Sequence, residues 1–149
     1  LASSAASDVY KRQGSCTFTA TDEKGVYDLI AKDVPLNNGV PFKAVLTDGR
    51  LVINFDNQYL GFISPNYIYL CAYDKAANVL TWGGNIMYVA DLQFTKAGLP
   101  FFEFKDDGTW KDHKVDGFMY GIFDKKWENG GQFAGKSYGY AVDIVMEHQ

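Results

Sequence analysis

Residues 42–55, FKAVLTDGRLVINF, show the pattern that decides the fold class of this chain. Two apolar arms flank Asp48-Gly49, a pair that tolerates the positive φ angles of a type I′ turn. Such a turn joins neighbouring antiparallel strands because its twist matches theirs. The stretch therefore predicts a β-hairpin.

Alternating apolar and polar residues, bounded by Gly, Pro, Asn and Asp, recur on both sides of this hairpin. Residues 74–80 are compatible with a short helix or with a hairpin tip, and residues 128–137 are expected to form a loop. The strands are expected within residues 15–21, 25–34, 42–55, 56–65, 66–74, 78–84, 85–95, 99–112, 116–127 and 138–148. Short strands at intervals of about 8–12 residues predict an all-β fold, an antiparallel β-sandwich or closed barrel of roughly nine to ten strands.

Length and charge exclude several classes of protein. The chain of 149 residues is long enough for one domain with a core of its own. Its net charge is −4 and it has no basic run, so nucleic acid is not an expected partner. No run of about 18 apolar residues occurs, so no membrane span is expected.

Residues 1–12 are expected to be the remnant of a signal or pro-segment. Residues 1–7, LASSAAS, are small and uncharged, as at the end of a secretory signal. Lys11-Arg12 then forms a dibasic processing site, unless the pair is a chance occurrence in an N-terminal arm. Cleavage after Arg12 would leave a single β domain, residues 13–149.

The two cysteines, Cys16 and Cys71, are too few for a zinc site. In an oxidising compartment they predict one disulfide, which would stabilise the fold by on the order of 4 kcal/mol in the chain-entropy model. The alternative is a pair of buried free thiols in an intracellular protein. We favour the disulfide because it agrees with the processing signal.

No catalytic constellation is evident, so neither an enzyme nor a metal or other cofactor is expected. His113 and His148 are the only histidines, and neither accompanies a recognisable nucleophile motif. Residues 130–137, GGQFAGKS, match the spacing of a phosphate-binding loop. An alternating segment follows them, however, where that loop requires a helix.

Residues 103–116 carry five carboxylates. They leave open a small hydrolase of wall polysaccharides or a calcium site, although turn geometry explains them too. These residues are Glu103, Asp106, Asp107, Asp112 and Asp116.

Aromatic residues make up 16% of the chain and are the better functional clue. The tryptophans within TWGGN, GTWKD and KWENGG have polar neighbours that can bond sugar hydroxyls while the indole packs on the sugar ring. The candidate carbohydrate-binding residues are Trp82, Tyr88, Trp110 and Trp127. The alternative is that these side chains anchor the core, as large aromatic side chains usually do.

Six short motifs occur in an order that resembles one family of proteins. They are CTFTAT (16–21), LTDGRLVI (46–53), YLCAYD (69–74), FEFKDDGTW (102–110), MYGIFDK (119–125) and GYAVDIVM (139–146). The series resembles secreted fungal cell-surface proteins, the small mannoprotein-like domains related to the C-terminal module of PIR cell-wall proteins. The resemblance covers residues 13 to about 147 and implies an exported protein trimmed after Lys-Arg. The chain lacks that family's later cysteines, a Ser/Thr-rich stalk and any Asn-x-Ser/Thr sequon.

The sequence therefore predicts a secreted, non-enzymatic protein of the cell surface or cell wall, with a wall polysaccharide or surface glycan as its partner. A carbohydrate-binding module or lectin is the alternative. A β-barrel that holds a small apolar molecule and a wall-polysaccharide hydrolase are further alternatives.

Overall fold

The computed structural model describes the backbone of residues 2–6, 11–31 and 41–147, and the side chains of residues 17–30 and 41–147. In these residues the regular structure consists of thirteen strands and one turn of 3-10 helix. The prediction of an all-β antiparallel fold is confirmed, with more strands than the nine to ten expected.

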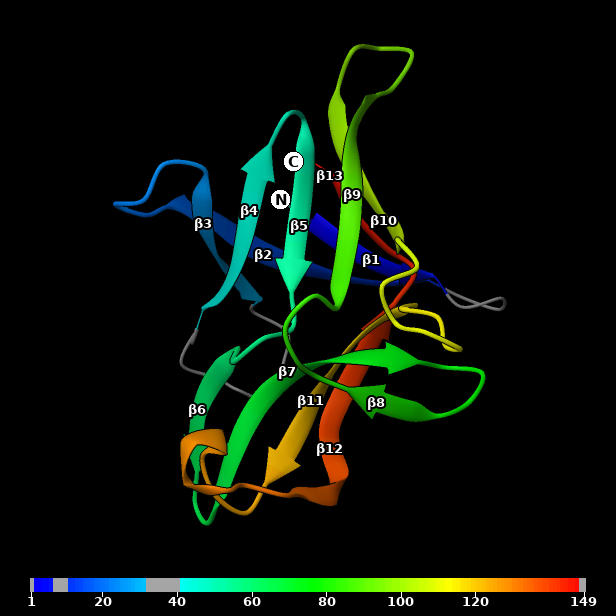
Figure 1. Cartoon of the computed structure of the whole chain (residues 1–149). Helices are drawn as coiled ribbons and strands as arrows, with labels where there is room; N and C mark the ends of the chain where they lie inside the picture. The colour runs from blue at the N-terminus through cyan, green and yellow to red at the C-terminus, as the bar shows by residue number, and fades with distance from the viewer. Residues whose placement is uncertain (1, 7–10, 32–40, 148–149) are drawn as a thin grey trace.

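Eight strands form a closed antiparallel barrel, in the order β1-β13-β10-β9-β5-β4-β3-β2. The barrel occupies the upper half of Figure 1. Its strands are β1 (Ala2–Ala6), β2 (Lys11–Ala20), β3 (Val26–Ala31), β4 (Phe42–Thr47), β5 (Arg50–Asn54), β9 (Met87–Phe94), β10 (Pro100–Asp106) and β13 (Ile144–Glu147).

The remaining five strands form a second sheet, in the order β12-β11-β7-β6, with β8 also paired to β7. This sheet lies below the barrel in Figure 1. Its elements are β6 (Tyr59–Ile63), β7 (Asn66–Asp74), β8 (Val79–Thr81), β11 (Gly117–Phe123), β12 (Phe133–Val142) and the short helix η1 (Trp127–Asn129).

The hairpin predicted at Asp48-Gly49 is present. Its two central residues have φ angles of 50° and 75°, as a type I′ turn requires. Strands β4 and β5 pair on either side of the turn, from Thr47 opposite Arg50 to Val45 opposite Val52. Alternate side chains of both strands point into the barrel, which is the arrangement that the sequence pattern predicts.

One face of the second sheet packs against the interior of the barrel and forms a single core with it. Strand β7 contributes Ile68, Leu70 and Ala72, each completely buried. The rings of Phe42 in the barrel and Phe118 in the second sheet lie 5.5 Å apart across this junction. Phe55, which follows β5, belongs to the same core. The barrel strands contribute Leu29, Ala44, Leu51, Ile53, Tyr88, Ala90, Phe104, Ile144 and Met146.

The opposite face of the second sheet has a smaller core of its own, which we call the outer aromatic cluster. Its completely buried members are Tyr69, Cys71 and Phe123. Partly buried side chains cover them: Tyr59, Tyr67, Leu80, Trp127 and Phe133. Strand β7 is therefore buried on both faces, since its residues alternate between the two cores.

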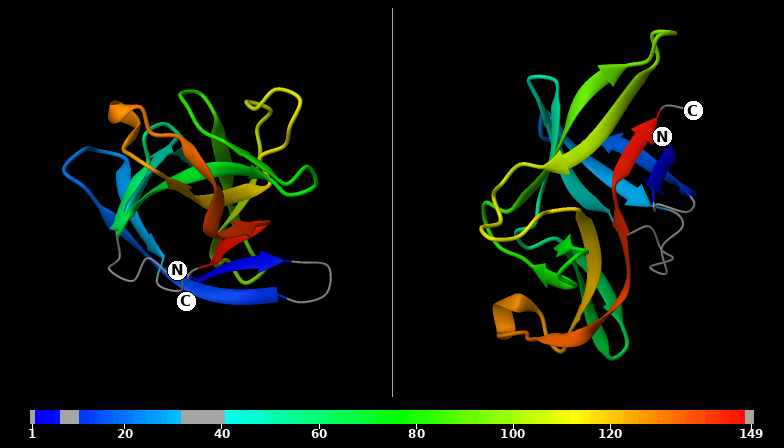
Figure 2. Two further views of the ribbon diagram at one scale, coloured as in Figure 1. Left: turned by 90° about the horizontal axis from the view of Figure 1, so that it is seen from below. Right: turned by 90° about the vertical axis from the view of Figure 1, so that its right-hand side faces the viewer.

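The last part of the chain differs from the sequence prediction in two ways. Residues 133–137, expected to be loop, belong to strand β12. The single strand expected at 138–148 is interrupted at Asp143, whose φ of 52° turns the chain from the second sheet into the barrel. An aspartate tolerates this left-handed conformation better than most side chains. Figure 2 shows the continuous path from β12 to β13.

Residues 74–80 form the tip of the hairpin between β7 and β8 and not a helix, with residues 75–78 as the turn that connects the two strands. Asp74 accepts a hydrogen bond from the backbone N–H of Ala77 (3.0 Å), and Asn78 adopts a positive φ of 53°. Short polar side chains at both positions suit such a turn.

The segment expected to be a leader remnant contributes to the barrel. Strand β1 pairs with β13 on one side and with β2 on the other. Lys11 and Arg12 begin β2, opposite Ala6 and Ala5. Strand β1 thus pairs backbone groups that β2 and β13 would otherwise expose at their edges. Cleavage after Arg12, and with it a mature domain that begins at residue 13, stays a prediction.

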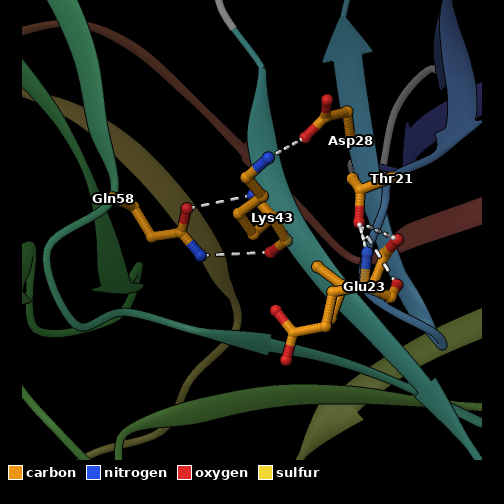
Figure 3. A network of polar contacts seen from close by, with 6 residues as sticks. Thr21, Glu23, Asp28, Lys43 and Gln58 are labelled. Atoms are coloured by element: carbon orange, nitrogen blue, oxygen red, sulfur yellow. Dashed lines mark hydrogen bonds and ion pairs between the residues drawn. The ribbon is translucent and has the colours of Figure 1, made fainter.

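The chain leaves the barrel for the second sheet beside Gln58, a residue only 8% exposed. Pairing between β4 and β5 ends at Val45 and Val52, although the same register would place Lys43 opposite Asn54. The amide of Gln58 fills this gap (Figure 3). Its Oε1 accepts a bond from the N–H of Lys43 (3.0 Å), and its Nε2 donates to the carbonyls of Lys43 (3.1 Å) and Asn54 (2.8 Å).

The turn between β2 and β3 is held by polar contacts that the same view shows (Figure 3). The hydroxyl of Thr21 donates to the carbonyl of Val26 (2.9 Å) and accepts a bond from the N–H of Glu23 (3.2 Å). The ammonium of Lys43 forms an ion pair with Asp28 on the neighbouring strand β3. Both partners are solvent-accessible, so this ion pair contributes little to stability.

We expect Gln58→Ala to lower the free energy of unfolding by about 2–4 kcal/mol, because three backbone groups lose a partner where water has poor access. Urea unfolding followed by circular dichroism measures this change. The matched control is Gln93→Ala, a substitution of an exposed glutamine in β9, which should cost less than about 0.5 kcal/mol. Equal losses in the two variants would contradict the role given to Gln58.

Candidate functional site

The four aromatic residues expected to bind carbohydrate lie in three different environments. Tyr88 is 1% exposed and belongs to the main core. Its hydroxyl donates to the carbonyl of Asp116 (2.8 Å) and accepts a bond from the N–H of Ile144 (3.4 Å). Burial also raises the pKa of this phenol well above its usual range. Tyr88 is therefore a core residue, and its assignment to a ligand site is corrected.

Trp110 is half-buried against the main core, apart from the other two tryptophans. Its ring stacks on the imidazole of His113, with centroids 4.5 Å apart and planes inclined by 30°. The pair lies in the loop between β10 and β11. This contact helps to order the loop. Trp110 therefore lies apart from the other two candidate tryptophans.

Trp82 and Trp127 are brought together on the outer aromatic cluster, with ring centroids 5.8 Å apart. The ring of Trp127 lies flat on Tyr69, at 4.1 Å and an interplanar angle of 7°. The backbone N–H of Trp127 donates to the Tyr69 hydroxyl (3.0 Å). Trp82 packs edge-on against Phe123 at 5.0 Å and remains 36% exposed. The cluster therefore holds Trp82 in position while one part of its ring meets solvent.

A groove of about 490 Å³ runs beside Trp82, and we call it the outer groove. Strand β8 lines one side and β12 the other, while Met119 comes from β11 between them. The lining combines apolar and aromatic side chains with a few polar ones. These residues are Asn78, Val79, Leu80, Trp82, Met119, Phe133, Gly135, Lys136 and Ser137.

An irregularity in β12 forms the second side of this groove. Gly121 lies opposite Ser137 and Phe123 opposite Phe133, so two steps along β11 correspond to four along β12. The extra residues form a bulge at Gly135, whose φ is 77°. The segment GGQFAGKS thus supplies a bulged strand. The phosphate-loop reading fails because a strand stands where that loop needs a helix.

Gly121 makes room for the cluster beneath the groove. A Cβ at this position would lie 3.1 Å from the sulfur of Cys71 and 3.2 Å from the ring of Phe123. Both neighbours are completely buried and have little freedom to move. The absence of a side chain at Gly121 therefore allows the cluster to pack closely.

The structure does not support the expected disulfide between Cys16 and Cys71. Cys71 is a free cysteine, buried in the outer aromatic cluster. It lies on the face of β7 that points away from the barrel, whereas Cys16 belongs to barrel strand β2. The side chain of Cys16 lies outside the described residues. Burial raises the pKa of the Cys71 thiol to about 12, so the thiol is protonated at neutral pH.

The carboxylates expected to form a hydrolase or calcium site serve mainly to hold loops. A second groove, of about 630 Å³, is lined by Asp74, Ala76, Asp106, Asp112, His113, Lys114 and Asp116. Oδ1 of Asp106 accepts bonds from the N–H groups of Gly108 (3.1 Å) and Val115 (3.3 Å). Oδ2 of Asp116 accepts one from the N–H of Lys75 (2.9 Å).

Asp74 is the most buried of these carboxylates, at 7% exposed. Its Oδ2 lies 3.0 Å from Nδ1 of His113 and accepts a bond from the N–H of Lys114 (3.3 Å). The N–H of Ala77, together with these two groups, lowers the pKa of Asp74 against the opposing effect of burial. The carboxylate thus joins the β7–β8 turn to the loop that holds Trp110.

The remaining carboxylates of the hydrolase hypothesis are not brought into this groove. Glu103 is exposed on β10, and Asp107 accepts a bond from the N–H of Thr109 (3.0 Å) within its own loop. Among the described residues, no group of three or more His, Cys, Asp or Glu side chains could hold a metal ion. His148 lies outside the described residues.

Comparisons with protein-family models, curated proteins and solved structures find no match for this chain. The resemblance to fungal surface proteins, the secreted location and the absence of enzymatic activity therefore stay predictions. In the part of the chain that the structure describes, no helix is long and apolar enough to cross a membrane.

We expect Cys71 to resist thiol reagents in the folded protein and to react as soon as the chain unfolds, because it is buried and protonated. Alkylation followed by intact mass measurement checks this, with Cys16→Ser as the variant that isolates Cys71. Wild-type protein should take up alkyl groups in denaturant without a reductant. A disulfide would instead block that uptake until reductant is added, which would contradict the free thiol.

The lowered pKa of Asp74 predicts a pH-dependent contribution to stability. A carboxyl whose pKa is lower in the folded state stabilises the fold above its unfolded value, about 3.9, and that contribution disappears as the pH falls through the folded value. The difference in unfolding free energy between wild type and Asp74→Asn should therefore be greatest at neutral pH and shrink below about pH 4. Urea unfolding across this range measures it, and a difference independent of pH would refute the assignment.

Proposed function

We propose that this chain is a non-enzymatic carbohydrate-binding domain that acts at the cell surface or cell wall through the outer groove. The observation that carries this proposal is Trp82, an exposed indole that packs against Phe123 and Trp127 and lines a groove of apolar and polar side chains. Sugar rings have apolar C–H faces and polar hydroxyl edges, so they suit a site that offers both kinds of contact.

The groove offers both kinds of contact, and each of its sides contributes to both. Leu80, Met119 and Phe133 give an apolar surface beside Trp82. Asn78 and Ser137 supply amide and hydroxyl groups for sugar hydroxyls, and Lys136 supplies three N–H donors. The volume of about 490 Å³ falls within the range of small-molecule sites. These features favour a short neutral or acidic glycan over a cationic one.

The packing of Trp82 supports recognition without a large conformational cost. Phe123 and Trp127 contact its ring before any ligand arrives. A side chain that is already ordered loses little entropy on binding, and more of the contact energy then appears as affinity. Trp127, which lies flat on Tyr69, serves as the support and Trp82 as the contacting ring.

The other functional classes have less support. The barrel side chains Leu51, Ile53 and Ala90 are completely buried in a shared core, so a barrel holding an apolar ligand would have to displace them. The hydrolase hypothesis needs two carboxylates aimed across a cleft, yet Asp106 and Asp116 accept bonds from backbone N–H groups. Wall polysaccharides and surface glycans are the partners that the sequence resemblance adds to the proposal.

We expect Trp82→Ala to weaken glycan binding by about tenfold or more, since a well-packed ring contact contributes on the order of 1–2 kcal/mol. A glycan array identifies the ligand, and isothermal titration measures its affinity for each variant. Ser137→Ala should weaken binding by a smaller factor, because it removes one hydrogen bond and keeps the apolar surface.

Phe62→Ala is the matched control for this experiment. Phe62 is 54% exposed on β6 of the same sheet and does not line the outer groove, so affinity should be unchanged. Equal loss in Trp82→Ala and Phe62→Ala would place binding elsewhere. The proposal would be rejected if the wild-type protein bound no glycan on the array and none of the wall polysaccharides glucan, mannan and chitin.

A further inference from the structure

The β9–β10 hairpin extends past the rim of the barrel (Figures 1 and 2). Strand β5 pairs with β9 only from Met87 to Asp91, and the last bond on that side runs from the N–H of Leu92 to the carbonyl of Gly49 (2.9 Å). Strand β13 pairs with β10 only over residues 101–103. Within the described residues, the end of the hairpin is paired only with itself.

The core-facing side of β9 continues into this projecting part without a cover. Side chains alternate along a strand, so Tyr88, Ala90, Leu92 and Phe94 share one face. Their exposed fractions rise along the strand from 1% and 0% to 39% and 63%. Leu99, in the connecting turn, is 57% exposed. We call Leu92, Phe94 and Leu99 the apolar tip.

Three hydrogen bonds within residues 95–99 satisfy part of the backbone of the turn at the apolar tip. The N–H of Thr95 donates to the carbonyl of Leu99 (2.9 Å), and the N–H of Gly98 donates to the carbonyl of Thr95 (2.9 Å). The Thr95 hydroxyl accepts a bond from the N–H of Leu99 (3.1 Å). Moving a turn into a non-aqueous phase is costly when its polar groups lose water without a replacement. These three bonds lower that cost.

The residues around the apolar tip carry one positive charge, opposite in sign to the net charge of the whole chain. Lys96 is the only charged residue in residues 92–102, LQFTKAGLPFF, while the chain carries a net charge of −4. A lysine can extend its apolar stem beside buried side chains and keep its ammonium at a polar boundary. At an anionic lipid surface, a single lysine near the headgroups adds a favourable electrostatic contribution.

We propose that the apolar tip is a membrane-contacting element that inserts Phe94 and Leu99 into the surface of an anionic bilayer. The tip projects from the barrel and is narrow, so it presents little area for a second protein surface. A lipid phase needs no complementary shape and can surround such a tip from all sides. This proposal rests on the hairpin alone and is independent of carbohydrate binding in the outer groove.

Vesicle flotation tests the proposal with the full chain. The vesicles are phosphatidylcholine alone, or phosphatidylcholine with phosphatidylserine. We expect wild-type protein to float with the anionic vesicles, and the double variant Phe94→Ser/Leu99→Ser to bind at least tenfold more weakly. Lys96→Glu should remove the preference for anionic vesicles, because it reverses the only charge within residues 92–102.

Phe62→Ser is the matched control, since it removes an exposed phenylalanine from the second sheet. It should float like the wild type, and circular dichroism should show the same fold for every variant. Two results would overturn the proposal: wild-type protein that stays with neither kind of vesicle, or a tip variant that floats like the control. A tip-dependent dimer in size-exclusion chromatography, without flotation, would assign the surface to a second copy of the chain instead.

Discussion

The structure depends on the burial of strand β7 on both of its faces. Ile68, Leu70 and Ala72 pack into the barrel core, whereas Tyr69 and Cys71 point the other way. The barrel covers only the first face, so the second must be covered by side chains from the sheet itself and from η1. Large aromatic rings suit this task because each buries a wide area from a single position. Trp82 lies at the margin of the rings that cover β7, and its partial exposure follows from that place.

Two buried polar side chains, Gln58 and Tyr88, lie where the chain passes between the barrel and the second sheet. Where the chain leaves the barrel, the amide of Gln58 occupies the gap between Lys43 and Asn54. Where it returns, the hydroxyl of Tyr88 connects the carbonyl of Asp116 with the N–H of Ile144. At the first crossing the regular strand pairing is interrupted, and the Gln58 amide satisfies the backbone groups that pairing would have used. At the second crossing the carbonyl of Asp116 also accepts a bond from the N–H of Asp143 (3.0 Å), and the Tyr88 hydroxyl adds a further partner. A buried polar side chain is stabilising in such a place because an unpaired backbone group costs more than the side chain's loss of water.

The sequence predicts the parts of this fold that depend on local geometry. The Asp48-Gly49 turn and the bounds of β7, residues 66–74, follow from turn chemistry and from alternation along the strand. Residues 133–137 were not predictable as a strand, because Gly135 is typical of a loop and the bulge that accommodates it depends on β11. The candidate site shows the same limit. The residue type marks all four predicted aromatics equally, but only long-range packing separates the buried Tyr88 from the exposed Trp82.

The two exposed apolar features arise from different causes, and the causes bear on what each can bind. Trp82 is exposed although Phe123 and Trp127 support its ring, so it presents a fixed plane. Such a plane discriminates between ligands by shape, as an ordered sugar ring requires. Phe94 is 63% exposed because β9 extends beyond the end of its neighbour β5. A side chain of that kind selects poorly by shape but gains from any apolar phase that surrounds it. The rigid site and the projecting tip are therefore suited to different partners, although both consist of aromatic rings on strands.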